Sequence, residues 1–407
     1  MQFVVVGGGI AGVNCSMEIL RSTTDPNVKV TLISANQHVK TVTNWHKIGQ
    51  FTENFDISQT VEPLTSDTRF HLIYDKVTSW SSTEKHIKLH KNGYIDYDKL
   101  CIATGASPIC PFKLKNVVTI RDTDTALNLQ TSLQNSKHVV IVGNGGIATE
   151  LVYELKNIEV TWIIRDSTVS SSFFPKDVEQ FILPKLIEGR SDGSKNSRIL
   201  KREKYTTSPD NVPHSTCGPA LGPDWCTAIN LSANSENKNL KIVTSSEVVN
   251  ICENTIVEYK TSDGTTSKTS CDFVVWATGS IANSKIWKDS EKDLTLASNS
   301  GIQVNDIFET SILDVYACGD VCTVKLDGQS SKWKQMHLWT QARQSSETCA
   351  KSMLFGRQTA EMFNIHLELF AHCTSFFGLK VIVFTNLHLL KRQKTRSYII
   401  QRFLITD

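Results

Sequence analysis

The chain has 407 residues, which suits two or three domains better than one. Hydrophobic residues make up 40% of it and charged residues 21%, the balance of a globular protein with a sizeable core. A net charge of +2 argues against a protein whose main task is a charge-driven grip on nucleic acid. No apolar run reaches the roughly 18 residues that a membrane-spanning helix needs, so no membrane association is expected.

The N-terminal segment predicts a buried strand at residues 3–6, then a glycine turn and a helix. It lacks the basic start of a signal peptide. The turn fits the pattern G-x-G-x-x-G and consists of Gly7, Gly9, Ile10, Ala11 and Gly12. The first glycine allows the tight turn, the second lets the backbone approach a pyrophosphate, and the third lets helix and strand pack closely. The pattern favours a dinucleotide site over a glycine-rich turn of another α/β protein.

The ribose of such a dinucleotide is usually held by an acid at the end of the next strand. That strand is predicted at residues 28–33, and Ser34 follows it where Asp or Glu is expected. A serine hydroxyl can still form a hydrogen bond, but without the strength that a carboxylate charge adds.

A second strand, glycine turn and helix begin at residue 139. The turn fits G-x-G-x-x-A and consists of Gly143, Gly145, Gly146, Ile147 and Ala148. Two such turns predict two nucleotides, one for each domain. The next strand, 160–164, runs into Arg165, which either accommodates the 2′-phosphate of NADPH or is a solvated surface charge. The donor is therefore NADPH as readily as NADH.

Further strands are predicted at residues 99–103, 272–277 and 315–317, and a helix at 339–354. The first two strands close with the segments Ala103-Thr104-Gly105 and Ala277-Thr278-Gly279, and the third leads to Gly319-Asp320. Residues 189–239 are polar and predict an insertion, residues 241–269 predict a hairpin with its turn at Asp263-Gly264, and a last strand starts at residue 380.

These features together resemble the pyridine nucleotide-disulphide oxidoreductase superfamily, over residue 3 to about residue 350. The resemblance implies an α/β fold of two Rossmann-like domains with parallel sheets, one for FAD and one for NAD(P)H, plus an incomplete C-terminal α+β segment. The implied domains are residues 1–112 (FAD, first part), 113–280 (NAD(P)H), 281–361 (FAD, second part) and 362–407 (partial C-terminal domain). Several segments are similar to one particular member, namely residues 40–44, 120–124, 143–148, 220–225, 338–343 and 369–372.

The resemblance also implies roles by matched position. In the superfamily the first glycine turn holds FAD and the second holds NAD(P)H. The further FAD contacts expected are Ser34, Lys40, Ala103, Thr104, Gly105, Arg121, Gly319, Asp320, Trp339 and Thr340. The further nicotinamide contacts expected are Glu150, Arg165 and Gly279.

Lys40 and Glu150 are the predicted catalytic residues. An ammonium at Lys40 would favour the anionic reduced flavin, and the family places a carboxylate such as Glu150 near the nicotinamide. Simpler interpretations stay open: a surface lysine, an acid stabilised by the helix dipole at Glu150, an ordinary ion pair at Arg121 and a core tryptophan at Trp339.

The cysteine pattern departs from that of disulphide reductases. Those enzymes carry a C-x-x-x-x-C pair after the second strand or a C-x-x-C pair in the nicotinamide domain, whereas this chain has no cysteine between Cys15 and Cys101. Cys217 and Cys226 lie in the polar insertion, and Cys318 and Cys322 flank the predicted flavin contact, where buried small side chains are the simpler interpretation. We therefore predict no dithiol relay. Because no Cys or His spacing fits a metal site, none is predicted from the sequence.

The predicted function is an FAD-dependent oxidoreductase that accepts hydride from NAD(P)H. Relatives are associated with oxidative-stress defence and with protecting the tRNA-splicing ligase complex, so that complex is an implied partner. Eleven scattered cysteines favour a reducing compartment, cytoplasm or nucleus. Two alternatives stay open: a reductase for a small electron-transfer protein, and a nucleotide-sensing flavoprotein with slow turnover. The chain's end at 396–402 resembles a strand cut short, which leaves the oligomeric state open.

Overall fold

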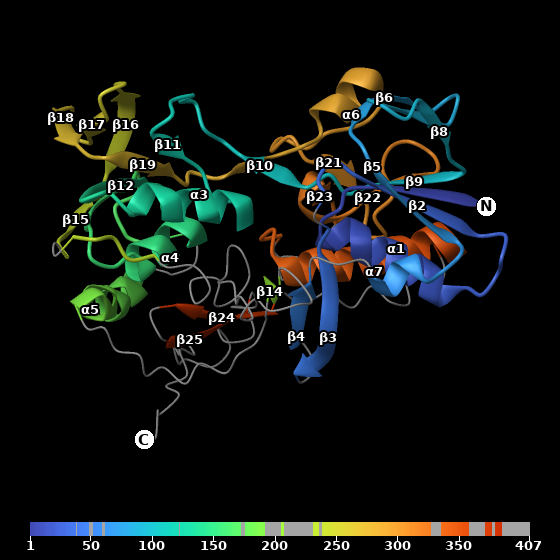
Figure 1. The fold of residues 1–407 in the computed structure, drawn as a ribbon, viewed down its shortest axis with the longest axis horizontal. Coiled ribbons are helices and arrows are strands. Elements are labelled where there is room, and N and C mark those ends of the chain that lie inside the picture. The colour runs from blue at the N-terminus through green and yellow to red at the C-terminus, as the bar shows by residue number, and fades with distance from the viewer. Residues whose placement is uncertain are drawn as a thin grey trace.

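The computed structural model describes residues 1–37, 39–48, 52–58, 62–121, 123–171, 176–191, 205–206, 231–235, 238–326, 335–357, 371–376 and 379–384. These residues form two lobes that are joined by two connecting segments of the chain (Figure 1). Most of the predicted insertion at 189–239 and the whole predicted strand end at 396–402 lie outside the described residues. No helix in the described part of the chain is both long and apolar enough to cross a bilayer.

The first lobe is built on a five-stranded sheet in which every pair of neighbouring strands is parallel. In spatial order its strands are β22 (Val315–Ala317), β9 (Lys99–Ile102), β1 (Gln2–Val6), β2 (Lys29–Ser34) and β5 (Phe70–Tyr74). The apolar side chains of β1 are buried on both faces, as the unbroken run of valines in its sequence predicts. Two helices, α1 (Ile10–Ser22) and α7 (Trp339–Phe355), lie side by side against this sheet (Figure 1).

The second lobe repeats this plan. Its five-stranded parallel sheet runs β11 (Val117–Val118), β19 (Phe273–Trp276), β12 (His138–Val142), β13 (Glu159–Ile163) and β15 (Leu240–Val243). Its helices are α3 (Thr123–Leu133), α4 (Gly146–Glu154) and α5 (Lys176–Ser191). In both sheets the strand before a glycine turn lies between the strand that ends in Ala-Thr-Gly and the strand that follows the turn's helix.

Each lobe also holds a three-stranded antiparallel meander. The first is β6 (Val77–Ser81), β7 (His86–Leu89) and β8 (Tyr94–Asp96), and the second is β16 (Ser246–Ile251), β17 (Ile256–Thr261) and β18 (Thr266–Ser270). The duplication of the dinucleotide-binding unit therefore extends beyond the glycine turns. The predicted hairpin at 241–269 is corrected in one respect: β15 joins the parallel sheet, and only the meander after it is antiparallel, with Asp263-Gly264 between β17 and β18.

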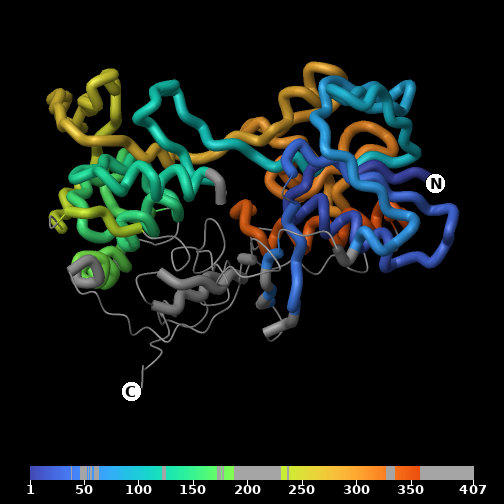
Figure 2. Tube along the Cα trace, viewed as in Figure 1, coloured from blue at the N-terminus to red at the C-terminus, as the bar shows by residue number. Residues whose placement is uncertain are grey.

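The two connections between the lobes pair with each other. They form a short antiparallel ladder of β10 (Ala106–Pro108) and β20 (Ser280–Ala282), which is seen between the lobes in Figure 1. Asn283 reinforces this ladder, since its amide donates to the carbonyl of Thr104 at 2.9 Å and accepts from Ser107 at 2.7 Å. The first lobe is thus interrupted by the second and resumes after β20, as the continuous trace in Figure 2 shows.

The remaining elements of the first lobe lie outside its five-stranded sheet. They are β3 (Thr41–Ile48), β4 (Thr52–Ser58), β21 (Ile302–Val304), β23 (Cys322–Val324), α2 (Glu62–Thr65), α6 (Lys285–Ser290) and the 3-10 turn η2 (Gly319–Val321). A two-residue strand from the insertion, β14 (Tyr205–Thr206), pairs in parallel with β4. Near the C-terminus, β24 (Ala371–Phe376) and β25 (Leu379–Phe384) form a hairpin, so the strand predicted from residue 380 is present.

Candidate dinucleotide sites

The first glycine turn has the geometry that its pattern predicts. Gly7 has φ +135°, and a Cβ there would lie 2.1 Å from the carbonyl oxygen of Ala103. A Cβ on Gly12 would lie 1.9 Å from the oxygen of Gly7, so both positions exclude any side chain. A Cβ on Gly9, by contrast, would meet nothing within 4 Å. The open space at Gly9 is where the backbone can meet a ligand, and it fits a bound pyrophosphate.

The second turn repeats these relations. Gly143 has φ +127°, and a Cβ there would lie 2.1 Å from the oxygen of Ala277, while the space around Gly145 is open. Gly146 and Ile147 start α4, and Ala148 is buried against the sheet. Both Ala-Thr-Gly segments therefore serve first as the surface on which a glycine turn packs. The contact of each alanine carbonyl with the first glycine of a turn is a packing role that the sequence alone did not reveal.

Both helices open without a side-chain cap. Gly9 and Gly145 are the N-cap residues of α1 and α4, and neither end has a side-chain cap hydrogen bond or an acid in its first turn. The first amides of a helix need acceptors, and a phosphate oxygen supplies one that the helix dipole favours. Ile10 and Ala11 are buried in the first turn of α1 and hold it against the sheet.

Lys40 and Trp339, which are far apart in the sequence, meet beside the first turn. The backbone N–H of Lys40 donates to the carbonyl of Gly8 at 2.9 Å. Its ammonium nitrogen lies 5.3 Å from the centre of the Trp339 ring, within range of a cation–π interaction. Trp339 and Thr340 are the first residues of α7, so the predicted flavin-covering helix begins where expected. The role of Lys40 beside a flavin remains a prediction.

Arg121 and the Gly319-Asp320 pair also lie at this end of the first lobe. The guanidinium of Arg121 is 3.0 Å from the position of a Cβ on Gly105, which has φ +66°. Gly319 has φ +74° and packs on Ala11, where a Cβ would come within 2.7 Å of the alanine methyl. The first glycine turn, Arg121, Gly319 and the start of α7 thus come from four separate parts of the chain and meet at one end of the sheet.

A pocket beside the predicted FAD contact Asp320 adds Gln335 and His337, which the sequence did not single out. Its lining includes Asp320, Gln335, His337 and Gln341. The Nδ1 of His337 lies 3.8 Å from a carboxylate oxygen of Asp320, and Gln335 fixes the segment by donating to the carbonyl of Cys322 at 2.7 Å. Gln341 belongs to the segment 338–343 that resembles one member of the family, and Gln335 and His337 lie just before it, which is the signal that could have found them.

The side chain of Ser34 is buried rather than exposed to a ligand site. It is buried under the turn, and a Cβ on Gly8 would lie 2.3 Å from its oxygen. Its hydroxyl donates to the carbonyl of Asn36 at 2.6 Å. Ser34 therefore shapes the first turn and explains why Gly8 is a glycine, whereas its contact with a ribose stays a prediction.

In the second lobe, Glu150 is buried within α4 and Arg165 is exposed just after β13. Gly279 has φ +123° with open space around it. Asp166 accepts hydrogen bonds from Asn144 of the glycine turn at 2.8 Å and from Ser171 at 2.6 Å, which lower the pKa of its carboxyl. The sequence alone does not indicate this hydrogen bond between Asn144 and Asp166, beside which the side chain of Arg165 faces solvent.

The segment after β2 contains no dithiol. It forms the hairpin of β3 and β4, and the chain has no cysteine between residues 16 and 100. Cys318 and Cys322 are buried, and the thiol of Cys322 donates to the carbonyl of Gly319 at 3.2 Å. Burial also raises the pKa of the Cys322 thiol well above its ordinary value, which makes it a poor nucleophile.

Comparisons with known proteins agree with this geometry. The model of the family described as pyridine nucleotide-disulphide oxidoreductase matches residues 1–189 and 226–346. A relative from Drosophila melanogaster, pyridine nucleotide-disulfide oxidoreductase domain-containing protein 1, is 34% identical over 397 residues, covering 94% of this chain and 82% of the relative. That protein is the member whose segments the sequence resembled, so the resemblance is confirmed.

Two solved structures have the same fold. A ferredoxin reductase from Rhodopseudomonas palustris superposes with a TM-score of 0.62 and 16% identity, covering 94% of this chain and 81% of the reductase. A water-forming NADH oxidase from Lactobacillus brevis superposes with a TM-score of 0.63 and 16% identity, covering 97% of this chain and 77% of the oxidase. The expected α/β architecture with two dinucleotide-binding lobes is confirmed.

Proposed function

Because this chain belongs to the pyridine nucleotide-disulphide oxidoreductase family, we propose that it takes hydride from NAD(P)H and passes the electrons on without a redox-active disulfide. Its cofactors are FAD and a nicotinamide dinucleotide. The observation that carries the proposal is the pair of matching glycine turns, each with a side-chain-free opening at its second glycine. Two nucleotide cradles in one chain suit a hydride donor and a flavin acceptor.

The first lobe would hold FAD. Gly9 and the uncapped start of α1 would receive the pyrophosphate, with Arg121 supplying a positive charge nearby. Asp320 would accept hydrogen bonds from the ribityl hydroxyls, as the family pattern implies. Lys40 and Trp339 would lie beside the ring system, where the ammonium would stabilise negative charge.

The second lobe would bind and orient the nicotinamide dinucleotide. Gly145 and the start of α4 would receive its pyrophosphate, and Glu150, four residues into the helix, would orient the nicotinamide. When bound, FAD supplies a two-electron acceptor for the hydride. Arg165 is exposed at the end of β13, a position that suits the 2′-phosphate of NADPH.

The absence of cysteine from the hairpin of β3 and β4 supports transfer to an external acceptor rather than through a protein dithiol. We also propose that the protein works in a reducing compartment, the cytoplasm or the nucleus. Its proposed roles there are defence against oxidative stress and protection of the tRNA-splicing ligase complex. The eight cysteines whose side chains the structure describes are all free thiols, which suits that compartment.

A second function is a reductase for a small electron-transfer protein. The observation in its favour is the fold shared with the ferredoxin reductase across most of both chains. It uses the same two nucleotide sites and differs only in the acceptor.

The deciding experiment is anaerobic stopped-flow absorption spectroscopy of the purified protein. We expect a flavin spectrum that bleaches when NADH or NADPH is added. If the reduced flavin reoxidises slowly in air but is reoxidised by a small-molecule acceptor, the first function is supported. If only an iron–sulfur protein reoxidises it rapidly, the second function is supported. A protein that is colourless and does not bind added FAD contradicts both.

A further inference from the structure

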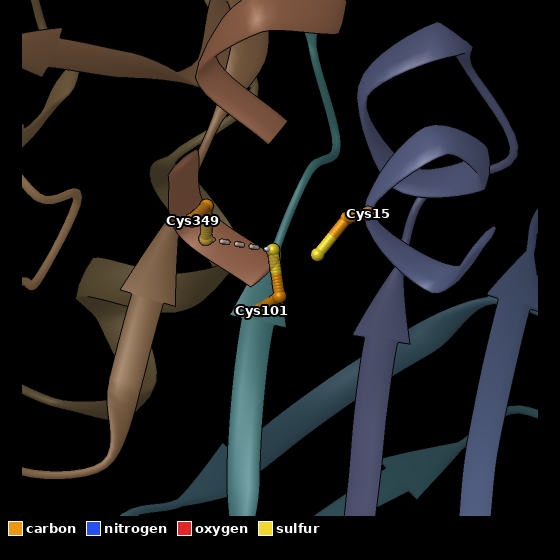
Figure 3. Close-up of side chains that lie close together, drawn as sticks. All are labelled: Cys15, Cys101 and Cys349. Carbon is orange, nitrogen blue, oxygen red and sulfur yellow. Dashed lines mark hydrogen bonds between the residues drawn. The ribbon is translucent and has the colours of Figure 1, made fainter. Parts of the chain in front are cut away.

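Four buried cysteines gather in the core of the first lobe, at residues that are far apart in the sequence. They are Cys15 of α1, Cys101 of β9, Cys318 at the end of β22 and Cys349 of α7, and each is 0% exposed. We call these residues the thiol cluster. Figure 3 shows three of them, with Cys15 and Cys349 on either side of Cys101. Because the cluster forms only where two helices meet the sheet, no sequence spacing indicates it.

The sulfur atoms are as close as the ligands of one metal ion. The Sγ of Cys101 lies 3.5 Å from that of Cys318 and 3.7 Å from that of Cys349. The sulfurs of Cys15, Cys101 and Cys349 all lie within 4.8 Å of one another. With zinc–sulfur bonds of about 2.3 Å, the ligands of a tetrahedral zinc ion are about 3.8 Å apart. Cys15, Cys101 and Cys349 would therefore need only small side-chain shifts to bind one zinc ion, and Cys318, at 3.5 Å from Cys101, is the fourth sulfur beside them.

The thiols also form one connected hydrogen-bonding group rather than four isolated side chains. The thiol of Cys101 lies within hydrogen-bonding distance of the thiols of both Cys318 and Cys349. A buried thiolate is costly without a cation beside it, and a metal ion is the cation that suits sulfur.

We propose that the thiol cluster is a structural site for a thiophilic metal ion, zinc(II), held by Cys15, Cys101 and Cys349 with Cys318 as the fourth sulfur. Each ligating thiol releases its proton when the metal binds. Zinc suits the site better than copper(I): four thiolates leave two net negative charges on zinc but three on copper, and buried charge is costly.

The site would fasten α1, β9 and α7 to one another beneath the first glycine turn. Since the cluster is fully enclosed, the ion would be acquired as the lobe folds. No spacing along the chain indicates this site, because its ligands come from positions as far apart as residues 15 and 349. The inference is independent of the proposed oxidoreductase function, because metal content can be measured whether or not flavin is reduced.

The test is metal analysis of the full-length protein after expression with zinc and gel filtration in a weak chelator. We expect about one zinc per chain, in line with a closed thiolate site. Protein grown in cobalt should show sulfur-to-cobalt charge-transfer bands and the visible bands of a tetrahedral cobalt thiolate. Cys101→Ala, which removes the sulfur nearest to two others, should lower the zinc content at least tenfold.

Cys322→Ala is the matched control, because Cys322 is a buried cysteine of the same lobe outside the thiol cluster, and it should retain zinc. Should Cys101→Ala fail to fold, the wild-type zinc content and cobalt spectrum still decide the matter. A folded wild-type protein without stoichiometric zinc would overturn the proposal. So would zinc that persists in folded Cys101→Ala, or alkylation and mass spectrometry that find a disulfide within the cluster.

Discussion

The glycines of the two turns are alike in sequence but differ in what they do. Gly7 and Gly143 lie against a backbone carbonyl at a positive φ, so the fold needs them even without a ligand. Gly9 and Gly145 have ordinary extended backbone and open surroundings, so the apo fold would accept a side chain there. Packing explains the first pair, and only a ligand explains the second.

This contrast predicts opposite outcomes for two alanine substitutions. Gly7→Ala should destabilise the protein by about 2 kcal/mol or more, because the new methyl overlaps the Ala103 carbonyl at a strained φ. Gly145→Ala should leave the thermal midpoint nearly unchanged but weaken NAD(P)H binding roughly tenfold, an effect of about 1.4 kcal/mol. Thermal unfolding and the NADH dependence of flavin reduction measure the two effects. Equal loss of stability in both variants would contradict the distinction.

Asp75, which follows the last residue of β5, makes the stability of the first lobe depend on pH in the acid range. Although desolvation opposes its ionisation, hydrogen bonds from the amides of Lys91, Lys76 and Asn92 lower its pKa to about 2. A carboxyl with a lowered pKa in the folded state stabilises the fold above its unfolded pKa, near 4. That stabilisation is lost as the pH falls from about 4 towards 2.

We therefore expect Asp75→Asn to be less stable than the wild type at neutral pH and to lose less stability between pH 4 and pH 2. Urea unfolding across that range measures the slope of stability against pH. Asp96→Asn, which changes an exposed carboxyl of β8 in the same lobe, serves as the control and should keep the wild-type slope. An unchanged slope in Asp75→Asn would show that other carboxyls set the acid limit.

Among the secondary-structure elements, the hairpin of β3 and β4 is fastened to α7 by a buried ion pair. The guanidinium of Arg343 donates to Glu53 of β4 at 2.9 Å and to Glu347 at 3.0 Å, and it stacks 4.8 Å from the ring of Trp45. The side chains of Arg343 and Glu53 are only 7% and 4% exposed. Lys40 immediately precedes this hairpin, and its ammonium lies 5.3 Å from the ring of Trp339 at the start of α7, so the chain before the hairpin contacts α7 as well.

Arg343→Gln should destabilise the protein by about 3–5 kcal/mol, because it leaves Glu53 buried without its partner charge. The double variant Arg343→Gln with Glu53→Gln should recover part of this loss, since no unpaired charge then remains between the two elements. Chemical unfolding of the single and double variants gives the coupling energy. A double variant as unstable as the sum of the single ones would contradict a direct pairing.

At the scale of the whole molecule, the two lobes are joined by the ladder of β10 and β20 and by Asn283. Any hydride transfer between nucleotides held in different lobes requires these connections to keep the lobes in register. The ladder is only three residues long on each strand, so the side-chain bonds of Asn283 are a large part of what fixes it.

Asn283→Ala removes the side-chain bonds to Thr104 and Ser107 and should cost about 1–3 kcal/mol of stability. We expect flavin content to stay near the wild-type value while the rate of flavin reduction by NAD(P)H falls, because the lobes lose register. Stopped-flow reduction and flavin absorbance separate the two effects. A loss of flavin in proportion to the loss of rate would instead indicate damage to the first lobe itself.

The sequence by itself determined the two parallel-sheet lobes, both glycine turns and the start of α7. These features depend on local patterns, namely buried apolar runs, glycines at fixed spacing and helix starts, which act over a few neighbouring residues. For the same reason it misplaced β15, because a strand's partner is chosen across the fold and not by the turn that follows it.

Only the tertiary structure decided which distant residues meet. It brought Lys40 to Trp339, Arg343 to Glu53, and Cys15 to Cys101 and Cys349, none of which share a spacing that a local pattern could reveal. Such pairs arise when two helices and a hairpin close on one sheet. Their chemistry depends on burial and on distances of a few ångströms, which exist only after the chain has folded.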